Sequence, residues 1–193
     1  MVMPLRTIIT LPDPRLRLVG APVAAVDDTI RALMDDMLET MYAAPGVGLA
    51  AIQIAEQKRV IVLDVAKRES ETAAPKPLCL ANPEILWASD ERSTCQEGCL
   101  SIPDVFEDVE RPSRVRARYL DRNGNAREIE ADGILATCLQ HEIDHLNGVL
   151  FIDHLSRLKR DRIMRKFRKN AKHGAPARKD GAGKERAPAS TVA

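Results

Sequence analysis

The stretch QHEIDHLNG, at residues 140–148, decides how the second half of this chain folds and what it could bind. It contains His141, Glu142 and His145 in the pattern HExxH. Side chains four residues apart lie on one face of a helix, so both histidines can reach one metal ion. Glu142 projects about 100° further around the helix axis, where it could act as a general base without being a ligand. The pattern also arises by chance, and many histidines in core helices are only hydrogen-bonded.

A catalytic metal site usually has three protein ligands and one open position, so this helix is one ligand short. One class of metallopeptidases supplies a later histidine, but the corresponding residue here is Phe151. Another class uses a downstream glutamate, and the next glutamate in this chain is Glu185, in the tail. Two candidates remain, His154 downstream and Cys99 upstream. Their ordinary alternatives are a surface or capping histidine and a buried structural thiol.

Composition favours one globular domain in a reducing compartment. The chain has 193 residues, of which 45% are hydrophobic, and no apolar run approaches the roughly 20 residues of a membrane span. Its start has neither the apolar run nor the small-residue cleavage site of a signal peptide. Without secretion, the four cysteines are expected to stay reduced. We therefore expect a cytoplasmic protein without membrane contact.

The net charge of +1 hides an uneven distribution of charged residues. Residues 157–193 hold 13 Lys and Arg against three acidic residues, whereas residues 1–156 hold 16 Lys and Arg against 25 acidic residues. The acidic body and basic C-terminal part predict that the latter meets an anionic partner. Residues 171–193 are rich in Ala, Gly, Pro, Lys and Arg and lack the apolar residues needed to fold, so this basic tail is expected to be disordered.

Hydrophobic periodicity predicts a single α+β domain over residues 1–170. Apolar residues at helical spacing predict three helices, at residues 29–43, about 133–147 and about 156–169. β-branched and alternating stretches predict strands at residues 59–65, 78–87, 115–120 and 126–131. We expect mixed or antiparallel strands packed around a central helix that carries HExxH, with a C-terminal helix after it.

Three segments taken together resemble the signature motifs of bacterial peptide deformylases. They are GVGLAAIQ at residues 46–53, EGCLS at residues 97–101 and QHEIDHLNG at residues 140–148, in the family's order and with similar separations. The opening ITLPDPRLR, at residues 9–17, is also similar to the family's N-terminal strand region. The resemblance covers roughly residues 4–170, and three motifs matched jointly are far more specific than HExxH alone.

The resemblance implies one divalent metal ion per chain, held by Cys99, His141 and His145 with water as the fourth ligand. The family's native metal is Fe²⁺, and Zn²⁺, Ni²⁺ or Co²⁺ can occupy the site, since a thiolate and two imidazoles accommodate all of them. The implied reaction is hydrolysis of the N-formyl group from the initiator methionine of new polypeptides. In it, metal-bound hydroxide attacks the formyl carbon, while Glu142 accepts a proton and later delivers it to the leaving amine.

The resemblance also implies roles for residues around the metal. The Gln53 side-chain amide and the Leu100 backbone N–H would stabilise the developing oxyanion. Pairing with the substrate backbone and binding of its methionine would involve a further set: Val47, Gly48, Gly98, Ile134 and Cys138. Spacing alone also suits core packing for the last two and a plain turn for the glycines. Glu97 and Arg111 are expected to pair in a supporting role.

The implied partners are N-formylmethionyl nascent peptides and the ribosome, whose phosphate-rich surface the basic C-terminal helix would contact. The chain is expected to act as a monomer. Two rival functions are retained at this point. A HExxH metallopeptidase is disfavoured by Phe151 and by the missing downstream glutamate, and an inactive ribosome-binding protein is disfavoured by the presence of Glu142 and Cys99.

Overall fold

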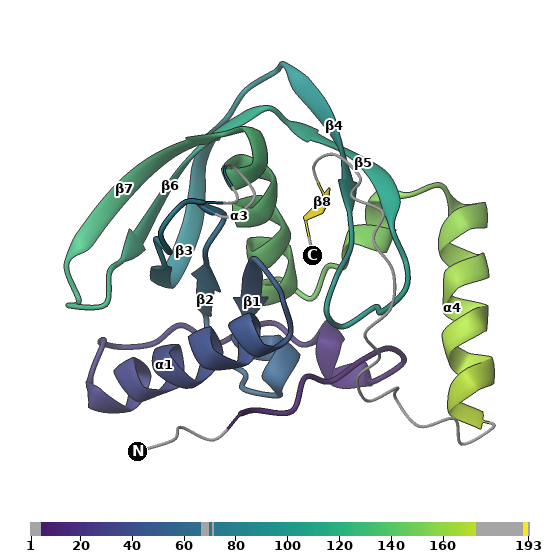
Figure 1. Cartoon of the computed structure of the whole chain (residues 1–193), viewed down its shortest axis with the longest axis horizontal. Coiled ribbons are helices and arrows are strands. Elements are labelled where there is room, and N and C mark those ends of the chain that lie inside the picture. Colours follow the sequence, from purple (N-terminus) through teal and green to yellow (C-terminus); the bar gives the residue numbers. More distant parts are fainter. Residues whose placement is uncertain (1–4, 67–69, 71, 173–190, 193) are drawn as a thin grey trace.

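The computed structural model of the chain describes residues 5–66, 70, 72–172 and 191–192. Figure 1 shows helix α3 at the centre of the fold, with one sheet on either side. The larger sheet is antiparallel and has the strand order β1 (Gly48–Ala50), β2 (Val60–Leu63), β3 (Leu78–Ala88), β6 (Arg114–Leu120), β7 (Ala126–Asp132). The smaller sheet has the order β5 (Glu107–Pro112), β4 (Arg92–Glu97), β8 (Thr191–Val192). The helical segments are η1 (Pro14–Arg17), α1 (Asp28–Ala43), η2 (Ala51–Ile54), α3 (Gly133–Leu146), η3 (Phe151–His154) and α4 (Arg157–Lys172).

Strand β2, with the sequence VIVL, is buried along its whole length because helices cover both faces of the large sheet. Alternate side chains of a strand point to opposite faces. Ile61 and Leu63 pack in one hydrophobic cluster with α3, while Val60 and Val62 pack in a second cluster with α1. A strand buried on both faces has a continuous apolar sequence, and this is why the run is so clear in the chain.

A third hydrophobic cluster joins the N-terminal segment, the smaller sheet and the C-terminal helix. Leu16 of η1 and Phe151 of η3 are fully buried in it, and Ile163 and Phe167 anchor one face of α4 there. Cys99, in the loop after β4, belongs to the same cluster. The loop that follows β4 is therefore packed against the N-terminal segment and the C-terminal helix in one cluster.

The prediction of a single α+β domain with antiparallel strands and a C-terminal helix is confirmed. Each predicted helix and strand is present, and its ends lie within three residues of the predicted positions. The prediction missed four strands, β1, β4, β5 and β8, the last of which lies in the tail that was expected to be disordered. β1 has only three residues, and β4 and β5 carry polar or charged side chains at most positions, so neither shows the apolar alternation by which strands are found.

Most of the predicted disordered tail, residues 173–190 and 193, lies outside the described residues. Helix α4 extends to Lys172, three residues further than predicted. Thr191–Val192 form β8, which runs parallel to β4 and pairs with Gln96 and Glu97. Figure 1 shows β8 in the space between β4 and α3. Within the described ranges, we find no helix with both the length and the apolar character that a membrane crossing needs.

Candidate metal centre

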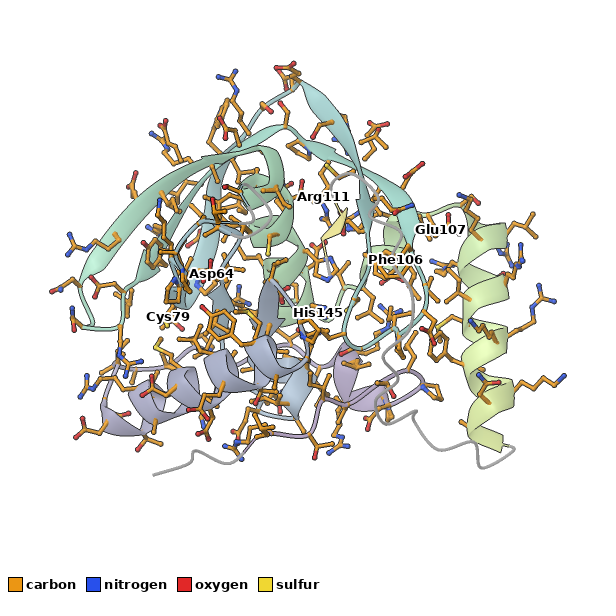
Figure 2. All side chains as sticks on the ribbon, in the orientation of Figure 1. Asp64, Cys79, Phe106, Glu107, Arg111 and His145 are labelled. Atoms are coloured by element: carbon orange, nitrogen blue, oxygen red, sulfur yellow. The ribbon has the colours of Figure 1, made fainter. Side chains whose placement is uncertain are left out.

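Helix α3 carries His141, Glu142 and His145 in its C-terminal half (Figure 2 labels His145). All three side chains are buried, with relative exposures of 3%, 3% and 1%. The apolar residues of α3 pack on the large sheet, so the face with the histidines turns toward the end of β4. The helix ends at Leu146, and Gly148 follows with a positive φ of 72°, which glycine adopts without a steric penalty.

Cys99, in the loop after β4, meets the two histidines. Its Sγ lies 3.3 Å from His145 Nε2, and one donor atom each of Cys99, His141 and His145 lie within 4.8 Å of one another. A thiolate and two imidazoles form a donor set suited to zinc, iron, nickel or cobalt, so these buried residues fit one such ion. His154, the other candidate ligand, lies elsewhere, because its Nε2 is 2.7 Å from Asp144 Oδ2.

Glu97 orients the ring of His141 from the side away from Cys99. The distance from His141 Nδ1 to Glu97 Oε2 is 2.8 Å, and Arg111 donates two hydrogen bonds to Glu97, at 2.6 and 3.0 Å. Burial raises the pKa of Glu97, but the hydrogen bonds from His141 and Arg111 outweigh burial and hold this pKa below its usual value. An ionised carboxylate only accepts, so His141 Nδ1 donates and Nε2 is left for a metal.

The second imidazole, His145, has different surroundings. Its Nδ1 is buried and has no hydrogen-bond partner within the described part of the chain. Burial and the nearby His141 lower the pKa of His145 well below its usual value. For His141, burial acts in the same direction, but the neighbouring Cys99 and Glu97 outweigh it and raise the pKa. The neutral His145 ring is the form that binds a metal ion.

Glu142 is buried beside the candidate metal ligands. Its Oε2 is buried and, in the ranges that the structure describes, has no hydrogen-bond partner. Burial, helped by the charge of Glu97, raises the pKa of Glu142 from its ordinary 4.5 to about 7. A carboxyl group with this pKa can both accept and release a proton near neutral pH. Gly48 makes room for it, since a Cβ at Gly48 would overlap Glu142 Oε1.

Gln53, on η2, places its side-chain amide next to Cys99. Its Oε1 accepts a hydrogen bond from Ala50 N at 2.8 Å, which fixes which end of the amide faces the site. Nε2 then donates to Ser101 Oγ at 3.1 Å and lies 3.5 Å from Cys99 Sγ. Leu100 lies between Cys99 and Ser101 in the same loop. The predicted oxyanion donors thus lie next to Cys99, the candidate thiol ligand.

Comparison with known proteins agrees with this arrangement. The family model of polypeptide deformylase matches residues 5–161 of the chain. The chain belongs to the polypeptide deformylase family. A peptide deformylase of Methylocella silvestris is 72% identical over 170 residues, which are 88% of this chain and 87% of that protein. The crystal structure of a peptide deformylase from Ehrlichia chaffeensis has a TM-score of 0.81 and 44% identity, over 88% of this chain and 98% of that one. A second structure from that organism, in complex with actinonin, has a TM-score of 0.81 and 46% identity, over 87% and 98% of the two chains.

The deformylase fold gathers the predicted substrate-binding residues near α3. Val47 and Cys138 lie in one hydrophobic cluster, where the Cys138 thiol donates to the Val47 carbonyl at 3.6 Å. Ile134 is partly buried and packs against the same cluster. Gly48 begins β1 beside them, and Gly98 lies in the loop after β4, next to Cys99 in the chain. Val47, Ile134 and Cys138 thus share one hydrophobic cluster, which core packing also explains, so their role in substrate binding stays a prediction.

Three contacts around this candidate site were not predicted from the sequence. Ser101 holds the amide of Gln53, and nothing in its sequence position indicates this contact. From the sequence, Phe151 was notable only because it cannot bind a metal. In the structure, its ring stacks on His141 with centroids 6.0 Å apart and an interplanar angle of 23°. Asp144 and His154 bond to each other, which requires η3 to fold back along α3.

Proposed function

We propose that this chain hydrolyses the N-formyl group of the N-terminal formyl-methionine of nascent polypeptides and releases formate. Membership of the polypeptide deformylase family supports this reaction. The observation that supports it best is the buried carboxylate of Glu142. One of its oxygens has no partner within the described residues, and it lies beside the three metal-binding side chains. Metal-assisted hydrolysis of an amide needs a group beside the metal site that can accept and donate a proton.

Cys99, His141 and His145 would hold one divalent metal ion, which we propose to be Fe²⁺ in the cell. Their burial and convergence support this ligand set. When bound, the metal supplies Lewis acidity at the formyl oxygen and lowers the pKa of water toward neutrality. A thiolate ligand is vulnerable to oxidation, so the site suits a reducing cytoplasm, where we propose that the enzyme acts.

Glu142 takes a proton from the attacking water and passes it to the amine nitrogen that leaves. Its Oε2 has no competing hydrogen bond in the described part of the chain, and its pKa of about 7 suits both transfers. The same carboxyl group can serve both steps because it is held in place by burial, with Gly48 packed against its other oxygen.

Gln53 and the backbone N–H of Leu100 stabilise the negative charge that develops on the formyl oxygen. Donors that are already oriented act strongly in a water-poor site, since they need no reorganisation during the reaction. Ala50 and Ser101 hold the Gln53 amide in one orientation, and its side chain is almost fully buried. These contacts support the role of Gln53 as a fixed donor.

The substrate peptide binds as an added strand along β1. β1 is the edge strand of the large sheet, and on its free side no strand of the described residues pairs with it. Main-chain pairing with Val47 and Gly48 reads no side chains, which suits an enzyme that accepts many sequences. The methionine side chain would enter the apolar space near Val47, Ile134 and Cys138, with Gly98 opposite. Burial and the charge of Glu142 raise the pKa of Cys138, which keeps this wall a neutral thiol.

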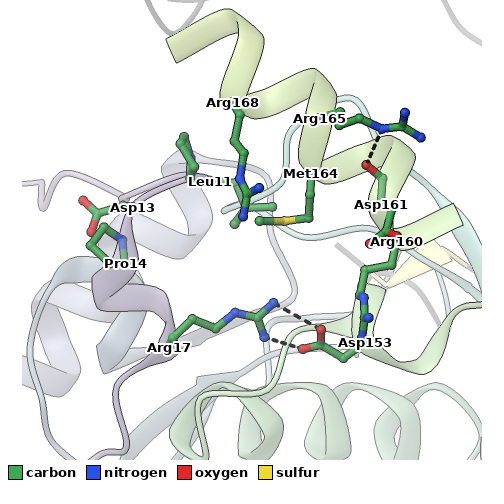
Figure 3. Close-up of a pocket in the computed structure, with 11 residues that line it drawn as sticks. Leu11, Asp13, Pro14, Arg17, Asp153, Arg160, Asp161, Met164, Arg165 and Arg168 are labelled. Carbon is green, nitrogen blue, oxygen red and sulfur yellow. Dashed lines mark hydrogen bonds and ion pairs between the residues drawn. The ribbon is translucent and has the colours of Figure 1, made fainter. Parts of the chain in front are cut away.

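Helix α4 is the surface that we propose for ribosome contact by a monomeric enzyme. It contains nine Lys and Arg residues against one Asp. A groove of about 730 Å³ separates it from η1, and Figure 3 shows Arg168 and Met164 extending from α4 into this groove. Charge reversal on α4 should abolish salt-dependent cosedimentation with ribosomes while turnover of a free peptide stays intact. Undiminished cosedimentation would contradict the contact.

A formyl-Met-Ala-Ser peptide tests the proposed reaction. Metal-loaded protein, handled without oxygen, should release one formate for each free α-amine that appears, and the peptide bonds should stay intact. Cleavage of peptide bonds without formate would indicate a metallopeptidase instead. Binding to ribosomes with neither product would indicate an inactive ribosome-binding protein.

A further inference from the structure

A series of polar contacts leads from the metal-binding residue His141 to the protein surface. Beyond Glu97 and Arg111, Arg111 Nη1 donates to Asp144 Oδ2 at 2.8 Å. The same oxygen lies 2.7 Å from Nε2 of His154. Side-chain exposure rises along the series, from 0% for Glu97 and 5% for Arg111 to 21% for Asp144 and 34% for His154. His154 is therefore the outer end of a network whose inner end touches a metal ligand.

The members of this network belong to four different elements. Glu97 ends β4, Arg111 lies in β5, Asp144 lies in α3 and His154 ends η3. The thiol ligand Cys99 follows β4, whereas both imidazole ligands lie on α3. Arg111 bonds both to Glu97 in β4 and to Asp144 in α3. It therefore links the smaller sheet, which leads to Cys99, with the helix that carries His141 and His145.

Asp144 accepts both bonds on one oxygen. Arg111 Nη1 donates to this oxygen at 2.8 Å, and a carboxylate opposite a guanidinium is the ionised partner of a charge-assisted hydrogen bond. An ionised carboxylate only accepts, so the hydrogen lies on Nε2 of His154. The 3.5 Å between Arg111 Nη1 and His154 Nε2 is then an approach of two donors to a shared acceptor. Two donors on one oxygen fix the direction of the carboxylate.

We propose that His154 is a positioning residue of the metal centre, which acts through Asp144, Arg111 and Glu97 on the ring of His141. Without His154, the partly exposed Asp144 carboxylate can turn toward water. Arg111 then loses a fixed partner and can shift on Glu97, which alone orients Nδ1 of His141. The inference rests on the metal centre proposed above.

The test measures metal binding by the full chain in four forms: wild type, His154→Phe, His154→Gln and Lys159→Met. Phenylalanine keeps the ring but removes the donor, and glutamine returns an N–H donor close to the place of Nε2. Lys159→Met is the matched control, because it breaks an exposed ion pair with Glu107, at 2.6 Å, on the same strand as Arg111 but outside the network. Co²⁺ is the probe, with affinity measured by competition with a chelator and geometry by the visible absorption of the cobalt protein.

Removal of a residue that directly orients a ligand weakens metal binding about 10- to 100-fold, and His154 acts three contacts further out than Glu97, through Asp144 and Arg111. We therefore expect His154→Phe to bind Co²⁺ about 3- to 10-fold more weakly and to shift the cobalt absorption bands. His154→Gln and Lys159→Met should stay within about twofold of wild type and keep its bands. The inference fails if His154→Phe matches wild type, if His154→Gln loses as much as His154→Phe, or if Lys159→Met loses as much. If wild type itself binds no Co²⁺, the proposed metal centre fails, and the inference fails with it.

Discussion

His141 and His145 lie four residues apart on one helix, yet their Nδ1 atoms have different surroundings. Nδ1 of His141 is hydrogen-bonded to Glu97, whereas Nδ1 of His145 has no partner within the described residues. On the closed side of the centre, His141 is backed by Glu97, Arg111, Asp144 and His154 in an unbroken series of hydrogen bonds. On the open side, made of His145, Glu142 and Gly48, two buried polar atoms have no partner within the described residues.

Each buried polar atom without a partner costs about 1–3 kcal/mol, so two at one place call for an explanation. The explanation that we favour is a division of tasks between the two sides. The closed side fixes the ligands, and the open side keeps a carboxylate oxygen of Glu142, unpaired within the described residues, and space for the reacting groups. The expectations below test this division, from the largest effect to the smallest.

Cys99→Ala should have the largest effect, because it removes the one ligand that comes from outside α3. Two imidazoles alone bind a divalent ion weakly, so the metal content should fall from about one per chain to near zero. Metal analysis after anaerobic purification measures this. Cys95→Ala, at a half-buried cysteine of β4, is the control and should keep its metal. Full metal content in Cys99→Ala would remove this residue from the ligand set.

Glu142→Gln should break the open side while leaving the closed side intact. Glutamine keeps the size of the side chain but cannot accept a proton, so kcat for the formyl-peptide should fall about 100- to 10,000-fold. The metal content should stay at the wild-type level, which separates this variant from the ligand variant. Turnover within tenfold of wild type would mean that Glu142 is not the proton carrier.

Gly48→Ala tests whether the space around Glu142 matters. A Cβ here would overlap Glu142 Oε1 and lie 2.9 Å from Cys138 Sγ, so the carboxylate must shift. A displacement of about 1 Å at a reacting group can reduce the rate about 100-fold, and we expect kcat/KM to fall by about 10- to 100-fold. Gly133→Ala is the control: its Cβ meets nothing within 4 Å, although φ is +51° there. It should lower stability and leave kcat unchanged, and an equal loss of kcat in both variants would contradict the steric explanation.

Arg111→Met should damage the closed side. It leaves Glu97 buried without its partner, which typically destabilises a protein by about 3–5 kcal/mol. Urea unfolding of the metal-free protein measures this loss. Metal affinity should also fall, by about 10- to 100-fold, because Glu97 no longer holds His141 in one orientation. If affinity and stability both stayed at wild-type levels, the closed side would not be needed to fix the ligands.

The raised pKa of Glu142 should make the stability of the metal-free protein depend on pH. The folded state favours the protonated carboxyl group, so its contribution to stability is full below pH 4.5 and is lost as pH rises through about 7. Relative to Glu142→Gln, the wild type should lose up to about 3 kcal/mol across this range. Urea unfolding of both proteins at a series of pH values measures the difference. A difference that does not change with pH would mean that the pKa is not raised.

The sequence predicted the parts of this molecule in which one local pattern decides the structure. α1 and α3 have apolar residues at helical spacing, and β2 is a continuous apolar run because helices cover both of its faces. β4 and β5 could not be found in this way. Their side chains are mostly polar, and these strands form through backbone pairing with each other, from Arg92 with Pro112 to Glu97 with Glu107.

The site was predictable only where it is local in the chain. His141, Glu142 and His145 share one helix and can be read from their spacing. Cys99 lies 42 positions before His141, and spacing left His154 as an equal candidate. The resemblance to a known family supplied Cys99, and the structure brings it to the histidines. The Asp144–His154 contact depends on how η3 folds back, and no sequence pattern encodes that return.

Strand β1 has a consequence for the behaviour of the protein in a crowded cell. A free sheet edge can pair with a strand from any other molecule, and long exposed edges promote aggregation. β1 limits this danger because it has only three residues and all of them are buried. The short, buried edge therefore gives another molecule little backbone to pair with, which protects the protein from self-association.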